Sequence, residues 1–280
     1  MSLQPAFNPP WKDDADWQND PEVAKRVEHL MMMVSKAGSH TLKYFQSENL
    51  RFESKKDDSP VTIADREAEQ IVREHVGQFF ADDTMEGEEF DDRQGNSRFG
   101  WIVDPIDGTR SFISGVPLYS TLLALLVDGE PFAGAIYIPA LDEIVVAAKG
   151  AGAWTRKGDE TWKQAKVSSR DHLSDAVFVV SQVDLFDEIS RRDVYSSLEK
   201  ECSITRSWGD GYGYLLVATG RADLMIDPLA NAWDIAAISP VIEEAGGRFT
   251  DWNGKPTVRS GNGIGSNGVL HEKVLKVVGV

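Results

Sequence analysis

Three short acidic segments are separated from one another in the sequence, and each is set in a tight local motif. No histidine or cysteine lies among them, so their donors are oxygen atoms, which suit hard divalent cations such as Mg²⁺ better than zinc. Only folding could bring these carboxylates together. The pattern predicts a metal site built from three segments: Gly87-Glu88-Glu89, Asp104-Pro105-Ile106-Asp107-Gly108-Thr109 and Trp233-Asp234.

The central segment is expected to leave a strand and enter a turn between its two aspartates. Pro105 stiffens that turn and Gly108 permits sharp backbone geometry. Asp104 and Asp107 can therefore converge on neighbouring metal ions, and the carbonyl of Ile106 between them can supply another oxygen.

A phosphate-binding element is expected next to these acids. Thr109 stands at an expected helix start, where free backbone N–H groups can hold a phosphate oxygen. Asp104 is placed to bridge two cations, with Glu88 and Asp234 on opposite sides. Metal-bound water is partly hydroxide near neutral pH, and two cations can clamp the attacking and leaving oxygens of a phosphate ester. The segments therefore predict metal-dependent hydrolysis of a phosphate monoester.

Each segment alone has a plainer interpretation. Asp-Gly-Thr is commonly a turn, Gly-Glu-Glu a solvated loop, and Trp233-Asp234 the acidic first turn of a helix, so only the combination is specific. An EF-hand calcium loop needs acids two residues apart and a glutamate at its twelfth position, which residues 104–115 lack. Phosphatases with an aspartyl-phosphate intermediate use Asp-x-Asp-Gly-Thr, whereas these acids are three apart, which disfavours a covalent intermediate.

Composition narrows the function class. The chain has 280 residues, 41% of them hydrophobic, which allows one large domain or two. Its net charge of −16 disfavours nucleic acid as a partner, and an anionic substrate would need a local attraction such as bound metal.

The single cysteine, Cys202, fits a reducing cytoplasm. The first twenty residues do not resemble a signal peptide, and the longest apolar run, 122–127, is too short for a membrane span.

Helices and strands arrive in blocks, which predicts a layered α+β fold rather than strict alternation. Residues 1–19 are expected to form a flexible arm, and residues 20–280 a domain whose two halves meet at about residue 150. Asp20 and Pro21 begin a helix whose apolar spacing continues to Phe45, and a second helix reaches Phe79 after a polar loop over 54–59. Strands are expected at 101–104, 118–127, 131–138, 143–148, 176–181, 222–226 and 247–250. Those over 118–148 are expected to form an antiparallel meander. Further helices are expected near 186–200, 210–219, 234–245 and from 269.

The combined motifs resemble the inositol monophosphatase superfamily of Mg²⁺-dependent, lithium-sensitive sugar phosphatases. The resemblance covers about residues 22–278 and implies a layered αβαβα fold, usually in a homodimer. It is carried by Gly87-Glu88-Glu89, by Trp101-Ile-Val-Asp-Pro-Ile-Asp-Gly-Thr109, and by Trp233-Asp234-Ile-Ala-Ala followed by Glu244-Ala-Gly-Gly247.

The resemblance also implies residue roles around two or three Mg²⁺ ions. Glu88, Asp104 and the Ile106 carbonyl would hold the first metal, and Asp104, Asp107 and Asp234 the second. Gly108 and Thr109 would bind phosphate. Asp65, in Pro60-Val-Thr-Ile-Ala-Asp65, would orient Thr109, which would activate water together with Glu88. A catalytic lysine best matches Lys55, with adjacent Lys56 as the alternative.

The second half resembles the histidinol-phosphate phosphatases of this superfamily, through Arg206-Ser-Trp-Gly-Asp210-Gly-Tyr-Gly-Tyr214, Asp227-Pro-Leu-Ala-Asn231 and 108–117, although Arg110 replaces their usual lysine. The resemblance implies that Asp210 and Asp227 hold the cationic amino-imidazole end of the substrate, with Trp208 adding an aromatic face and Arg206 a further contact.

Asp210 could equally be a helix N-cap. Carboxylates also accept hydrogen bonds from a neutral polyol, so inositol phosphate and broader sugar phosphates stay open. A regulatory, RNA-associated role is a further alternative, which the acidic charge disfavours.

Overall fold

The computed structural model describes residues 9, 11, 15–48, 51–54 and 60–279. The last part of the expected arm belongs to the folded body, because Asp16–Asn19 form a 3-10 helix and Trp17 is buried in a hydrophobic cluster. Within the described residues, no helix combines the length and apolar character that crossing a membrane requires.

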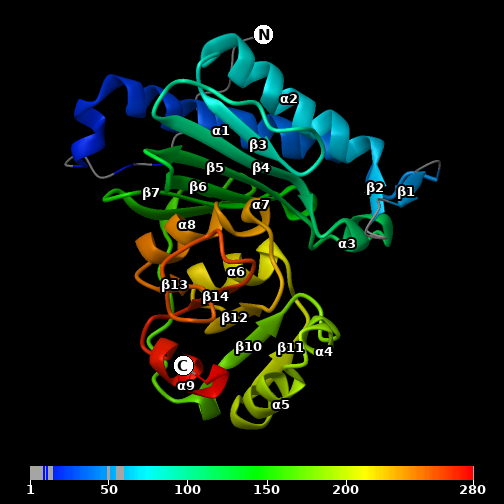
Figure 1. The fold of residues 1–280 in the computed structure, drawn as a ribbon, viewed down its shortest axis with the longest axis vertical. Coiled ribbons are helices and arrows are strands. Elements are labelled where there is room, and N and C mark those ends of the chain that lie inside the picture. The colour runs from blue at the N-terminus through cyan, green and yellow to red at the C-terminus, as the bar shows by residue number, and fades with distance from the viewer. Residues whose placement is uncertain (1–8, 10, 12–14, 49–50, 55–59, 280) are drawn as a thin grey trace.

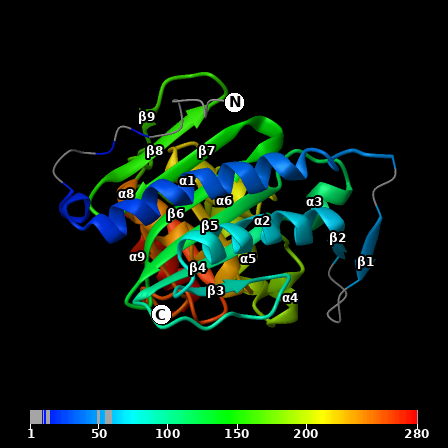
Figure 2. The same ribbon diagram turned by 90° about the horizontal axis from the view of Figure 1, so that it is seen from above.

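Two long helices form the outermost layer. Helix α1 (Pro21–Thr41) begins as expected, since the Asp20 carboxylate accepts hydrogen bonds from the N–H groups of Glu22 and Val23. It ends at Thr41 and is followed by turns, short of the expected Phe45. Helix α2 (Ile63–Phe79) begins with a capping box, in which Thr62 and Asp65 bind each other's backbone N–H groups. The two helices lie side by side across one large sheet (Figure 2).

This sheet carries the predicted meander. Strands β5, β6 and β7 pair antiparallel in sequence order, as expected, and β3 adds in parallel at the edge beside β4. In the described residues its seven strands follow one another in order: β3 (Thr84–Gly87), β4 (Phe99–Asp107), β5 (Ser120–Val127), β6 (Glu130–Ile138), β7 (Glu143–Ala148), β8 (Gly152–Lys157) and β9 (Lys163–Gln164). A separate short hairpin joins β1 (Phe52–Ser54) to β2 (Pro60–Thr62).

A second, mixed sheet follows. Strands β11, β10 and β12 are parallel, and β14 and β13 continue the sheet antiparallel. Its strands are β10 (Val177–Val180), β11 (Ile204–Arg206), β12 (Leu224–Asp227), β13 (Arg248–Thr250) and β14 (Gly263–Ser266). Because the first sheet runs to Gln164, the change of sheet falls between residues 164 and 177, later than the expected 150.

The layers alternate helix, sheet, helix, sheet, helix (Figure 1). The α+β class and the αβαβα order are therefore confirmed. One hydrophobic cluster lies under α1 and α2, a second surrounds the helices between the sheets, and a third lies on the outer face of the second sheet. The middle helices are α6 (Gly211–Ala218), α7 (Ala232–Ile235) and α8 (Ile238–Glu244); the outer ones are α4 (Leu185–Glu188), α5 (Arg192–Glu201) and α9 (His271–Val278); α3 (Thr109–Ile113) lies at one end of the first sheet.

Three expected elements differ from those observed. The helix expected over 186–200 is two helices, because Ser190 adopts a left-handed φ of 57° and Arg191 N–H bonds back to Phe186 O, which closes α4. The helix expected over 234–245 is interrupted between α7 and α8. Pro240, in the first turn of α8, has no N–H to donate to the carbonyl four residues earlier, so the helix is not continuous there. Strand β4 continues through Asp107, past the expected turn, with a register irregularity against β5 between Asp104 and Asp107.

Candidate active site

Three of the predicted ligands meet at the junction of the two halves. Asp104 and Asp107 lie at the end of β4, and Asp234 lies in the first turn of α7, which packs against β4. Each offers a carboxylate oxygen, and these oxygens lie within 4.8 Å of one another. The structure therefore brings together acids that are more than a hundred residues apart in the sequence.

Local hydrogen bonds fix the direction of each carboxylate. Asp104 Oδ1 accepts from the N–H of Ile106 at 3.1 Å. Asp107 Oδ2 accepts from the hydroxyl of Ser120 at 2.6 Å and from the N–H of Gly211. Asp234 Oδ2 accepts from the N–H of Asn231 at 2.6 Å as part of a capping box. The same bonds that shape the turn and the helix start thus hold the acids in place.

The electrostatics of the cluster favour a bound cation. Burial, with the added repulsion of Glu88, Asp107 and Asp234, raises the pKa of Asp104 well above its ordinary value. The pKa of Asp107 is raised well above its ordinary value in the same way, first by burial and then by Asp210 and Asp234, and burial raises that of Asp234 to about 7. Charged forms of closely spaced, buried acids are unfavourable unless positive charge compensates them. An all-oxygen donor set of this kind fits a hard divalent cation.

Glu88 adjoins this cluster from a different element. It follows the end of β3 and is half-buried. Its carboxylate lies close enough to hydrogen-bond with that of Asp104, and its charge also raises the pKa values of Asp65 and Asp234. Glu88 therefore lies beside Asp104 and Asp234, and its role as a ligand on the side opposite Asp234 stays a prediction.

Asp65 and Thr109 also lie at the site, and the contact expected between them is present as a long hydrogen bond. The Thr109 hydroxyl donates to the Ile106 carbonyl at 3.0 Å, whereas Asp65 Oδ1 is 3.5 Å away. Asp65 is fully buried, its Oδ2 accepts from the N–H and hydroxyl of Thr62, and burial raises its pKa to about 6. Lys55 and Lys56 lie outside the described residues.

Gly108 connects the metal acids to the second half of the chain. It caps α3 with a left-handed φ of 83°, which glycine adopts without strain. A Cβ at this position would also come within 2.6 Å of Asp210 Oδ2. The motif glycine therefore permits both the turn toward Thr109 and the close approach of Asp210.

A cavity of about 260 Å³ extends from the acids, and both predicted specificity aspartates line it together with Asp107 and Asp234. Asp227 is only 6% exposed, accepts a hydrogen bond from the Ser181 hydroxyl, and has a pKa raised to about 6 by burial. Asp210 stands at the N-cap position of α6, but its side chain makes no capping hydrogen bond. Burial raises its pKa as well.

Two predicted substrate contacts are not at this cavity. Arg206 and Trp208 do not line it; the Arg206 guanidinium donates to the Thr205 carbonyl, and Trp208 is 40% exposed. Ser181 and Tyr214 do line it, although the sequence motifs had given neither of them a role. Tyr214 falls four residues after Asp210 in the same motif, so helical spacing was the signal that could have identified it.

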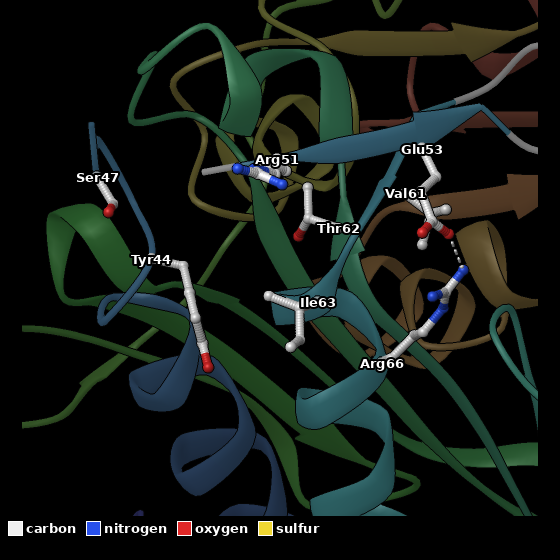
Figure 3. A pocket seen from close by; sticks show the side chains of 8 residues that line it. All are labelled: Tyr44, Ser47, Arg51, Glu53, Val61, Thr62, Ile63 and Arg66. Atoms are coloured by element: carbon white, nitrogen blue, oxygen red, sulfur yellow. Dashed lines mark hydrogen bonds and ion pairs between the residues drawn. The ribbon is translucent and has the colours of Figure 1, made fainter. Parts of the chain in front are cut away.

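A larger cavity, about 430 Å³, lies beside the β1–β2 hairpin and the start of α2. Figure 3 shows Arg66 and Glu53 paired at 2.8 Å on one side of it, and Tyr44 on the other. Its described lining contains Thr62, which binds Asp65, but not Glu88, Asp104, Asp107 or Asp234. The smaller cavity is therefore the candidate active site.

Comparison with known proteins agrees with this geometry. Residues 22–279 match the model of the inositol monophosphatase family. The chain is 40% identical over 248 residues to a histidinol-phosphatase of Chlorobaculum parvum, covering 88% of this chain and 94% of that protein. It is 35% identical over 221 residues to a fructose-1,6-bisphosphatase/inositol-1-monophosphatase of Thermotoga maritima, covering 78% of this chain and 82% of that protein.

A solved structure shares the whole architecture. The crystal structure of extragenic suppressor protein suhB from Bartonella henselae superposes with a TM-score of 0.82 at 29% identity, over 91% of this chain and 98% of that one. The family match, the curated relatives and the acidic cluster at the end of β4 all indicate hydrolysis of a phosphate monoester. The chain belongs to the inositol monophosphatase family and is a phosphoric monoester hydrolase.

Proposed function

We propose that this enzyme hydrolyses L-histidinol phosphate to L-histidinol and phosphate, with Mg²⁺ held by Glu88, Asp104, the Ile106 carbonyl, Asp107 and Asp234. The observation that carries the proposal is that two further carboxylates, Asp210 and Asp227, line the same cavity as Asp107 and Asp234 of the acidic cluster. The name of the Chlorobaculum parvum relative points the same way.

Bound Mg²⁺ would lower the pKa of a water molecule and neutralise phosphate charge. The protein supplies the positions. Backbone N–H groups at Gly108 and Thr109, where α3 begins, would hold a phosphate oxygen. The Glu88 carboxylate would take the proton of the attacking water. The Thr109 hydroxyl, which lies between the Ile106 carbonyl and Asp65, would accept a hydrogen bond from that water and orient it. The water oxygen would bond to phosphorus as the bond to the histidinol oxygen breaks. That oxygen would take up a proton from solvent, and Glu88 would release the proton it took to solvent.

The far end of the cavity suits a cation. Asp227 and Asp210 are acceptors when ionised, and a bound ammonium or imidazolium would favour their charged forms against the desolvation that raises their pKa values. Arg110 lines the same cavity and donates to Gln182 at 2.9 Å, and its positive charge favours the ionised form of Asp210. A phosphate at one end and a cation at the other match the charge pattern of histidinol phosphate.

Inositol-1-phosphate, or a broader range of sugar phosphates, is the second candidate. The Thermotoga maritima relative carries both a sugar-bisphosphatase and an inositol-phosphatase name. Ionised carboxylates accept hydrogen bonds from neutral hydroxyl groups as readily as from cations. The two candidates differ in whether the substrate needs positive charge at this end.

A substrate panel tests the choice. We expect kcat/KM for L-histidinol phosphate to exceed that for myo-inositol-1-phosphate at least tenfold, with activity dependent on Mg²⁺ and inhibited by lithium. A tenfold preference for the inositol ester would overturn the substrate assignment. Asp234→Asn should nearly abolish turnover while its circular dichroism spectrum stays unchanged; full activity at ordinary Mg²⁺ would refute the ligand role of Asp234.

The remaining properties are proposals from the family resemblance and the composition. We expect residues 20–280 to act as one catalytic domain, in a homodimer, in the cytoplasm, with no nucleic acid or membrane as partner. The net charge of −16 supports the expectation about nucleic acid. Cys202 is buried and burial raises its pKa to about 12, so a catalytic role for this thiol is disfavoured.

A further inference from the structure

Glu88 differs from the other proposed metal ligands in how the fold supports it. Asp104 and Asp107 lie on β4, where both pair with residues of β5, and Asp234 lies in a helix turn that packs against β4. Glu88 instead follows β3, the edge strand of the sheet, which pairs only with β4 among the described strands. A ligand in a loop at a sheet edge needs other contacts to hold it in one position.

Glu69 of α2 supplies the first of these contacts. Its side chain is fully buried, and its Oε2 accepts a hydrogen bond from the N–H of Glu89 at 2.8 Å. The carboxylate lies directly against Gly87, where a Cβ would come within 2.3 Å of Oε1. The residues on both sides of Glu88 are thus fitted to the Glu69 carboxylate, and the glycine of the motif is explained by this close approach.

Arg73, one turn further along α2, supplies the second. Its Nε donates to Glu69 Oε1 at 2.7 Å, so the buried carboxylate is paired. Its two terminal nitrogens donate to the carbonyls of Phe90 and Asp91, each at 3.0 Å. The planar guanidinium therefore bonds the helix and the loop at the same time, which a lysine could not do.

We propose that Glu69 and Arg73 are positioning residues that hold Glu88 in place for the metal, an inference that rests on the proposed metal site. Neither is placed to touch substrate. Glu69 fixes the backbone immediately after Glu88, and Arg73 fixes the two peptide units beyond it. Residues that orient a ligand in this way commonly change metal affinity by about 10- to 100-fold when they are replaced.

Mg²⁺ binding to the substrate-free protein, measured by isothermal titration calorimetry, tests the proposal without relying on turnover. We expect Glu69→Gln and Arg73→Lys each to raise the Kd for Mg²⁺ by about tenfold or more. Glu74→Gln is the matched control, because Glu74 is an exposed acid on the same helix that accepts a hydrogen bond from Gln70 at 3.1 Å. This control should stay within about twofold of the wild-type value.

A double-variant comparison separates positioning from a general structural effect. If Glu69 acts through Glu88, Glu69→Gln should weaken Mg²⁺ binding little further when Glu88→Gln is already present. Equal weakening in both backgrounds, or a wild-type Kd for both single variants, would overturn the proposal. Circular dichroism checks folding, and if Glu69→Gln does not fold, Arg73→Lys decides alone.

Failure of the metal site itself gives a different result. If the wild-type protein and Asp104→Asn bind Mg²⁺ equally weakly, the proposed function fails and the positioning role fails with it. If the wild type binds Mg²⁺ and Asp104→Asn does not, while Glu69→Gln and Arg73→Lys bind normally, only the positioning role is refuted.

Discussion

Replacement of Asp227 by asparagine tests the substrate assignment at the residue best placed to decide it. Asp227 ends β12, is 6% exposed, and accepts from Ser181 inside the cavity. Asparagine has nearly the same shape and keeps a carbonyl oxygen for Ser181, so the change removes the negative charge and turns one acceptor oxygen into an N–H donor. Alanine would in addition leave the Ser181 hydroxyl without this acceptor.

The size of the effect follows from the kind of contact that is lost. A hydrogen bond to a charged group contributes about 1.5–3 kcal/mol net. At about 1.4 kcal/mol per factor of ten, kcat/KM for L-histidinol phosphate should fall by roughly 10- to 150-fold. The same variant should change kcat/KM for p-nitrophenyl phosphate by less than about threefold, because that ester carries no cation for Asp227 to bind.

The assay is phosphate release at saturating Mg²⁺, with both substrates and with Asp187→Asn as the control. Asp187 is an exposed aspartate on α4 that pairs with Arg192 at 2.7 Å, so its replacement removes the same charge outside the cavity. Asp187→Asn should leave both substrates unaffected. An equal loss for both substrates in Asp227→Asn would remove Asp227 from the specificity pocket and favour a neutral substrate.

Two further predictions concern stability. Asp83→Asn should lower the free energy of unfolding by about 3 kcal/mol in urea titrations, because it leaves the buried Arg26 guanidinium without its bidentate partner. Glu22→Gln changes the exposed partner of the same arginine and should lower the free energy of unfolding by less than about 1 kcal/mol. Equal losses in the two variants would refute the role of burial. Burial lowers the pKa of His271 from 6.5 to about 4, so between these pH values the unfolded chain binds a proton that the folded chain does not. The free energy of unfolding should therefore fall as the pH drops from about 6.5 toward 4, by about 3 kcal/mol in full. A His271→Gln variant with the same pH dependence as the wild type would contradict this.

The metal cluster could be predicted because its signals are local. Asp104, Asp107 and Gly108 follow one another within a few residues, and their turn geometry can be judged from the proline and glycine beside them. The start of α1 at Asp20 and Pro21 was predictable for the same reason. These positions are fixed by backbone chemistry that needs no knowledge of the rest of the fold.

The parts that could not be predicted depend on tertiary contacts. Strand β14 contains Gly263 and Gly265, which favour no strand by themselves; a Cβ at either would come within 2.8 Å of the Phe249 or Tyr214 ring, so packing selects the glycines. Neighbouring residues of one motif also separate in space. Asp210 reaches the cavity whereas Trp208 lies outside it, a difference that depends on the backbone turn at Asp210, where φ is 44°.

The most direct test of the central claim is anomalous diffraction from crystals of the protein soaked in Mn²⁺, a divalent cation that also prefers oxygen ligands. We predict anomalous density within coordination distance of the carboxylates of Asp104, Asp107 and Asp234, with Glu88 on a second, adjacent peak. Density confined to other acidic positions, or none among these four residues in crystals that hold Mn²⁺ elsewhere, would contradict the account.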